Sequence, residues 1–86
     1  MGQPYIVFYG LSTCMWCKKT KAFLDGKGVK YNCVFVNELT GEEREKVMDL
    51  VEKLNPDLSF PTVKIGDKVI VGYNVDKIEE ALKSAE

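Results

Sequence analysis

The sequence predicts an α/β fold with a four-stranded mixed sheet and three helices, in the order β-α-β-α-β-β-α. Three observations carry this prediction: strand-like apolar runs alternate with helical periodicity, a tight hairpin follows, and an amphipathic segment comes last. At 86 residues the chain has room for one hydrophobic core. A single domain over residues 1–86 is therefore expected.

The first strand and the first helix are expected in direct succession. Tyr5–Tyr9 is an unbroken run of β-branched and aromatic residues, typical of a strand buried on both faces between helices. A helix should then run from Cys14 or Met15 to about Lys27, because apolar residues recur there at helical spacing. Its N-terminus should lie at the pair formed by Cys14 and Cys17.

A second strand is expected at Tyr31–Val36, after Gly26 and Gly28 break the helical pattern. A crossover of this length between neighbouring strands is typical of parallel pairing. Cys33 lies in mid-strand, where a free cysteine is most often a small buried hydrophobe. The alternative for Cys33 is a regulatory or dimer-forming thiol.

The second helix is expected to begin at a capping box formed by Thr40 and Glu43, whose side chains satisfy N–H groups at a helix start. Apolar residues at helical spacing follow over Val47–Leu54. The helix should end before Asn55–Pro56, because proline lacks an N–H and restricts the residue before it.

The last third of the chain predicts a hairpin and a third helix. Thr62–Ile65 and Lys68–Val71 flank the turn Gly66–Asp67, as in an antiparallel hairpin. The helix should run from about Val75 to Ser84. Its apolar face is expected to consist of Ile78, Ala81, Leu82 and Ala85.

Composition excludes several classes of partner. The 12 basic and 13 acidic residues give a net charge of −1 without a basic block, so nucleic acid is not an expected ligand. No apolar run approaches the roughly 20 residues that span a bilayer, so no membrane association is expected. Met1–Pro4 lack the basic region of an export signal. A cytoplasmic monomer is expected.

The pair Cys14 and Cys17 is the candidate reactive site. A thiol must become a thiolate to attack a disulfide, and a helix N-terminus favours the anion. Cys14 would have that position and act as the nucleophile. Cys17, one turn further on, would resolve the mixed disulfide formed at Cys14.

The residues around the pair leave alternatives open. Met15 and Trp16 would form an apolar collar that contacts a partner, but Trp16 could equally be part of the packing. Lys18 and Lys19 add positive charge near the thiols or simply face solvent. Cys-x-x-Cys is also half of a zinc site, but such a site usually takes four ligands, and the chain has no histidine and only Cys33 to spare. Redox chemistry is therefore favoured over zinc.

With these residues the chain resembles the glutaredoxins and related redoxins over nearly its whole length. Three stretches carry the resemblance: Tyr9 with the motif Cys14–Cys17, the pair Phe60–Pro61, and Val71–Asp76 before the last helix. The resemblance implies a thioredoxin-like fold and a cis bond before the proline, opposite the disulfide. The substrate-binding residues that it implies are Tyr9, Met15, Trp16, Phe60, Pro61, Gly72, Tyr73 and Asp76.

The chain departs from the family pattern close to the pair. Leu11 and Ser12 stand where glutathione-using members usually carry a lysine, and Met15 replaces a common proline. Ser59–Phe60 replaces a Thr-Val pair, and Gly72–Tyr73 replaces two glycines. The electron donor therefore stays open between glutathione, another low-molecular-weight thiol and a reductase protein.

The expected function is dithiol reduction of disulfides in proteins or small molecules, with no bound cofactor and no metal. The rival is an iron–sulfur or metal carrier in which two chains share a cluster through Cys14, as some members of the wider family do. The presence of Cys17 argues against the rival, because the cluster carriers mostly have a single active-site cysteine.

Overall fold

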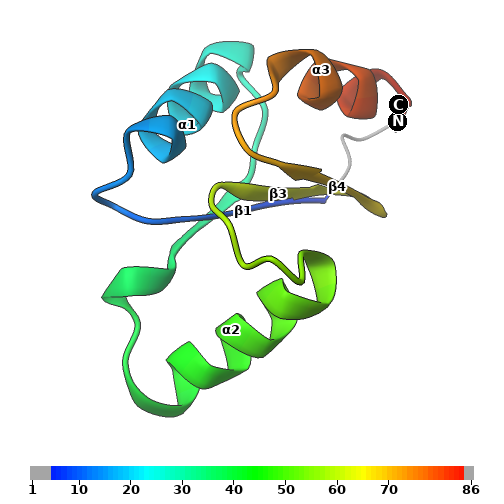
Figure 1. The fold of residues 1–86 in the computed structure, drawn as a ribbon. Coiled ribbons are helices and arrows are strands. Elements are labelled where there is room, and N and C mark those ends of the chain that lie inside the picture. The colour runs from blue at the N-terminus through cyan, green and yellow to red at the C-terminus, as the bar shows by residue number, and fades with distance from the viewer. Residues whose placement is uncertain (1–4, 85–86) are drawn as a thin grey trace.

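A computed structural model describes residues 5–84, and it has the predicted order of elements (Figure 1). The strands are β1 (Ile6–Gly10), β2 (Asn32–Phe35), β3 (Thr62–Ile65) and β4 (Lys68–Val71). The helices are α1 (Met15–Lys27), α2 (Gly41–Leu54) and α3 (Val75–Ser84), with a 3₁₀ turn η1 (Val36–Glu38) between β2 and α2. The mixed sheet and the three helices match the thioredoxin-like fold.

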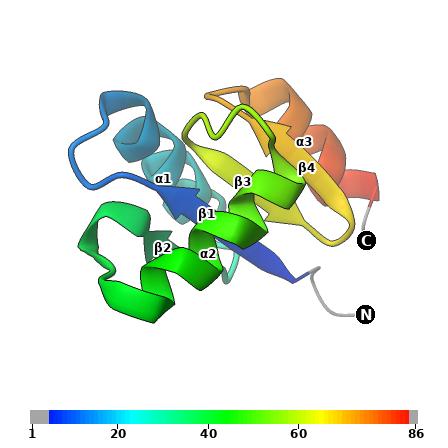
Figure 2. The ribbon, with the colours of Figure 1, turned by 60° about the horizontal axis from the view of Figure 1, so that its bottom comes forward.

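The four strands form one sheet in the order β2-β1-β3-β4. β1 pairs with β2 in parallel and with β3 in antiparallel fashion, and β3 and β4 form the predicted antiparallel hairpin. Helices α1 and α3 cover one face of the sheet and α2 covers the other (Figures 1 and 2). None of the helices over residues 5–84 is long and apolar enough to cross a membrane.

The core lies on both faces of β1, all five residues of which are buried. Successive side chains of a strand point to opposite faces. Ile6 and Phe8 therefore join the core under α1 and α3, whereas Val7 and Tyr9 join the core under α2. The prediction of a strand buried on both faces is confirmed, and β1 leads directly from this core to the cysteine pair.

Four predicted boundaries, both ends of the first and of the second strand, shift by one residue. Tyr5 is exposed and lies before β1, which extends instead to Gly10. Tyr31 precedes β2, and Val36 begins the turn η1. The third helix has the predicted bounds and buries Ile78 and Ala81, with Leu82 half-buried. Ala85 of the predicted apolar face lies outside the described residues.

The prediction that Cys33 is buried is wrong, because this cysteine is exposed. Within residues 5–84, β2 is an edge strand with β1 as its only neighbour, so it has less cover than a central strand. Cys33 is in register with Phe8. Tyr31 and Phe35, on either side of Cys33, contact the Phe8 ring edge-on with centroids 6.4 and 6.2 Å away. These two rings make the contact with the core and leave the thiol outside it.

The prediction of a capping box at the start of α2 is wrong. Thr40 is the N-cap residue, as predicted, but its side chain makes no capping hydrogen bond. Gly41 follows with φ 61°, whereas a capping box requires helical backbone from its first helical residue onward. The chain therefore enters α2 by a different turn.

Gly10 has no room for a side chain. A Cβ atom there would lie 2.7 and 2.8 Å from two atoms of the Phe8 ring and 3.2 Å from the Cys17 Cβ. Phe8 and Cys17 are both fully buried, so neither side chain can move aside into solvent. The end of β1 thus passes directly beneath the first turn of α1.

Replacing Gly10 with alanine is expected to destabilise the protein by about 1–3 kcal/mol, the usual cost of overpacking a core. Urea unfolding followed by circular dichroism measures the change. Gly26→Ala is the matched control, because no atom lies within 4 Å of the Cβ added there and the residue is in a helix. It should stabilise by about 0.5–1 kcal/mol. Equal stability of both variants would contradict the close approach at Gly10.

Candidate active site

Cys14 is the N-cap residue of α1, with extended backbone angles of φ −86° and ψ 123°. Its Sγ accepts a hydrogen bond from the Cys17 N–H at 3.3 Å, and its carbonyl accepts the Lys18 N–H at 3.1 Å. The Cys14 N–H in turn donates to the Leu11 carbonyl at 3.1 Å. The sulfur is thereby held where the first N–H groups of the helix point.

The surroundings of the Cys14 thiol favour its anion. Burial alone acts to raise the pKa, but hydrogen bonds from the Cys17 thiol and from the N–H groups of Cys17 and Trp16 more than offset it. The net effect is a pKa of Cys14 below the ordinary value of a thiol. A half-buried thiol in this state is accessible and nucleophilic.

Cys17 is the opposite kind of thiol. It is a fully buried residue of α1, and its Sγ accepts the Leu11 N–H at 3.4 Å. Burial, with a smaller contribution from the neighbouring Cys14 sulfur, raises the pKa of Cys17 to about 12. Both thiols are free in this structure. Of the two thiols, Cys14 therefore ionises at the lower pH.

A reciprocal pair of hydrogen bonds fixes the loop before Cys14. The Ser12 N–H donates to Asn37 Oδ1 at 2.9 Å, and Asn37 Nδ2 donates to Ser12 Oγ at 2.8 Å. Asn37 lies in η1, twenty-five positions from Ser12 in the sequence. No sequence pattern pointed to Asn37, because the crossover alone brings η1 beside this loop.

The two residues between the cysteines lie at the surface. Met15 and Trp16 are 66% and 53% exposed, so neither side chain is part of the buried core. The Trp16 ring lies 5.6 Å from the Tyr73 ring at an interplanar angle of 31°, and Lys19 Nζ is 4.7 Å from the centroid of Trp16. Lys18 is exposed.

A groove of about 240 Å³ opens beside this pair of rings. It is lined by Trp16, Phe60, Gly72 and Tyr73, four of the residues implied by the family resemblance. Trp16 belongs to the first turn of α1, which begins directly after Cys14. Chain segments far apart in the sequence thus meet at one apolar site.

The peptide bond Phe60–Pro61 is cis, as the resemblance implies. The buried Pro61 accepts a hydrogen bond at its carbonyl from the Gly72 N–H at 2.8 Å. Gly72 has φ 81°, a conformation that residues with a side chain rarely adopt. The loop before β3 and the loop after β4 are therefore joined at the groove.

Tyr9 and Asp76 do not line this groove. Tyr9 is buried in the core under α2, and burial followed by the charge of Tyr5 raises its pKa. Asp76 is exposed in the first turn of α3. Tyr9 is therefore a packing residue, and Asp76 is a surface residue of α3.

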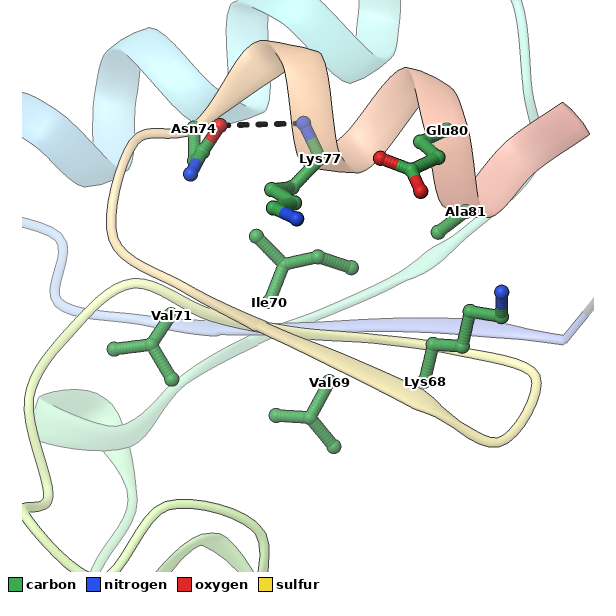
Figure 3. A pocket seen from close by; sticks show the side chains of 8 residues that line it. All are labelled: Lys68, Val69, Ile70, Val71, Asn74, Lys77, Glu80 and Ala81. Carbon is green, nitrogen blue, oxygen red and sulfur yellow. Dashed lines mark hydrogen bonds between the residues drawn. The ribbon is translucent and has the colours of Figure 1, made fainter. Parts of the chain in front are cut away.

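A larger hollow of about 420 Å³ lies between β4 and α3 (Figure 3). Ile70 points from β4 toward α3 at its centre, whereas Val69 and Val71 point toward the opposite face. Its polar lining consists of Lys68, Asn74, Lys77 and Glu80, without a thiol. Over residues 5–84 there is also no group of three or more His, Cys, Asp or Glu that could hold a metal ion. The cysteine pair remains the candidate reactive site.

Comparison with known sequences points to one family. A sequence profile described as glutaredoxin matches residues 6–70. A glutaredoxin-like 8.6 kDa protein of the rubredoxin operon of Clostridium pasteurianum is 31% identical over 78 residues, which cover 91% of this chain and 97% of the relative. Glutaredoxin 1 of Rickettsia prowazekii is 34% identical over 76 residues, which cover 84% of this chain and 77% of the relative.

Solved structures agree with this comparison. Methanoredoxin of Methanosarcina acetivorans is 47% identical with a TM-score of 0.89, over 95% of this chain and 87% of that chain. The glutaredoxin of Methanosarcina mazei Go1 is 46% identical with a TM-score of 0.87, over 92% and 78% of the two chains. A glutaredoxin of Archaeoglobus fulgidus is 40% identical with a TM-score of 0.88, over 95% and 89%.

Proposed function

This chain belongs to the glutaredoxin family of thiol–disulfide oxidoreductases, and from this premise we propose that it is a dithiol electron carrier that reduces disulfides in proteins or small molecules. One observation carries the proposal: an accessible thiol of lowered pKa lies one helical turn from a buried thiol of raised pKa. The first is suited to attack and the second to wait until a mixed disulfide has formed.

The proposed reaction moves two electrons in two exchange steps. The Cys14 thiolate attacks one sulfur of the substrate disulfide, a new S–S bond forms, and the first substrate sulfur leaves and takes a proton from water. Cys17 then loses its proton and attacks Cys14 Sγ, which releases the second substrate sulfur as a thiol. The protein ends as a Cys14–Cys17 disulfide and the substrate as two thiols.

The charge on Cys14 determines when Cys17 can lose its proton and attack. The negative sulfur of Cys14 contributes to the raised pKa of Cys17, after the larger contribution of burial. Once Cys14 is bonded to a substrate sulfur it no longer carries that charge. The proton then leaves Cys17 more readily, and the resolving step follows the attack and does not precede it.

The groove beside Cys14 supports binding of a peptide chain on either side of the disulfide. Trp16 and Tyr73 supply exposed aromatic area, which is a common anchor in protein interfaces. In the described part of the chain, no hydrogen bond engages the N–H or C=O of Phe60, so both groups are open to a substrate backbone. Pairing of this kind adds a short strand to the site.

The proposed electron donor is a thiol, either glutathione or another low-molecular-weight thiol, or a reductase protein. No bound cofactor enters the proposed reaction, because thiols alone exchange the electrons. The proposal places a monomer in the cytoplasm, where reducing conditions keep such a pair supplied with electrons.

A redox titration of the Cys14 and Cys17 couple tests the proposed function. Equilibration in glutathione and in dithiothreitol buffers, followed by the fluorescence of the single tryptophan Trp16, should give one reversible two-electron transition. A midpoint near or above about −230 mV supports glutathione as donor, and a lower one supports a reductase protein.

Cys33→Ser is the control for this titration, since the third thiol lies outside the couple and its loss should leave the midpoint unchanged. A missing transition would refute dithiol exchange. Visible absorbance after anaerobic addition of iron and sulfide would then support the rival function, a cluster shared between two chains through Cys14.

A further inference from the structure

Asn55, directly after α2, is a buried polar residue with only 5% of its surface exposed. Its Nδ2 donates to the Ser59 carbonyl at 3.1 Å, to Ser59 Oγ at 3.0 Å and to Thr62 Oγ1 at 3.3 Å. Its Oδ1 accepts the Asp57 N–H at 3.3 Å, and its carbonyl accepts the Leu58 N–H at 2.9 Å. One asparagine thus holds both sides of the loop between α2 and β3.

The second buried polar residue of this cluster is Thr62, at the start of β3. Thr62 Oγ1 donates to the Ser59 carbonyl at 2.8 Å while it accepts from Asn55 Nδ2. Ser59 is therefore bound from two directions. The residue after Ser59 is Phe60, so the cluster fixes the backbone immediately before the site where substrate should pair.

The loop needs such support. Leu58 has φ 53°, the only positive value found for a residue other than glycine in the described chain. Conformations of this kind persist where the surroundings impose them. The hydrogen bonds that Asn55 makes on both sides of Leu58 provide that constraint. The half-buried Phe60 ring in addition contacts the core clusters on both faces of the sheet.

Ordinary packing does not require an asparagine here. A buried amide must satisfy its hydrogen-bonding groups or lose stability, and an apolar side chain would fill the space without that demand. The amide instead makes its side-chain bonds to the loop that carries Phe60 and Pro61 and to Thr62, the first residue of β3 after that loop. Its geometry serves that loop.

We propose that Asn55 is a positioning residue for exchange with peptide disulfides: it fixes the backbone of Phe60 at the spacing that an extended substrate chain pairs with. The inference rests on the proposed disulfide exchange at Cys14. Because small disulfides have no peptide backbone to pair with Phe60, the effect of Asn55 is confined to substrates that have one.

The experiment compares two oxidised substrates in single-turnover reactions of the pre-reduced full-length protein, followed by Trp16 fluorescence. One is a disulfide-bonded peptide and the other is hydroxyethyl disulfide. For Asn55→Leu, the half-saturating concentration of the peptide should rise about tenfold while the limiting rate changes less than twofold. The rate constant for hydroxyethyl disulfide should change less than twofold.

Two further variants keep the test decisive. Thr62→Val conserves shape and removes only the hydroxyl, so the peptide's half-saturating concentration should rise about threefold in a protein that folds. Val36→Ala removes a buried side chain from the core under α2 and touches no hydrogen bond of the loop. It should lower stability without changing the half-saturating concentration.

Equal losses with both substrates in Asn55→Leu would overturn the proposal, because they would show an effect on Cys14 or on the fold. An unchanged half-saturating concentration for the peptide in both Asn55→Leu and Thr62→Val would overturn it as well. Failure of the unmodified protein to react with either disulfide is a separate outcome, which would refute the proposed function and this inference with it.

Discussion

Replacing Cys14 with serine is expected to lower the rate of disulfide reduction by at least about a thousandfold, since removal of a nucleophile costs an enzyme this much or more. The serine hydroxyl is not ionised near neutral pH, and the hydrogen bonds from Cys17 and Trp16 cannot make it so. Cys17 cannot substitute, because it is buried and its pKa is raised to about 12. The rate at which the protein consumes a small disulfide, with dithiothreitol as the reductant, measures the loss.

Cys33→Ser is the matched control for this prediction, because it removes an exposed thiol from the edge strand β2. Its rate should stay within twofold of that of the unmodified protein. A Cys14→Ser variant that retained more than one tenth of the activity would show that another thiol attacks the substrate. Loss of activity in Cys33→Ser would show that Cys33 takes part in the reaction.

The second large effect is expected in alkylation. At pH 7 iodoacetamide should modify Cys14 at least about 10³-fold faster than Cys17 in the Cys33→Ser background. Alkylation requires the thiolate, and a thiol of ordinary pKa near 8.5 has about 3% of it at this pH. A thiol of pKa about 12, as at Cys17, has about a thousandth of that amount. Mass spectrometry of the two cysteine-containing peptides measures both rates.

The pH dependence of the Cys14 reaction has a definite sign. A lowered pKa means that the thiolate is already present at lower pH, so the midpoint of the rise in alkylation rate should lie below that of an ordinary thiol. In urea the alkylation rate of the same cysteine should have its midpoint at a pH of about 8.5. A midpoint in the folded protein at or above the unfolded one would contradict the hydrogen bonds assigned to Cys14.

The two thiols differ because one helix places them in different surroundings. Cys14 lies at the first N–H groups of α1 and Cys17 lies one turn later, on the face that packs against the sheet. The close passage of Gly10 beneath Cys17 holds this turn on the core. A pair of identical side chains three positions apart therefore separates into an attacking thiol and a resolving thiol.

The sequence by itself determined the elements and the reactive pair. Apolar periodicity is local information, so it predicted β1, the hairpin and the three helices to within about a residue of their ends. The spacing of two residues between Cys14 and Cys17, directly before a helical pattern, predicted that this pair lies at the N-terminus of α1. The family resemblance added the cis bond at Phe60–Pro61 and the groove residues around Trp16.

Only the tertiary structure decided how residues distant in the sequence meet. The strand order put β2 at an edge, where Tyr31 and Phe35 take the contact with the core and Cys33 stays exposed. It also brought Asn37 to Ser12 and set Asn55 beneath the loop that carries Phe60. Periodicity reports which face of an element is apolar, but the partner of a polar side chain depends on where the chain returns.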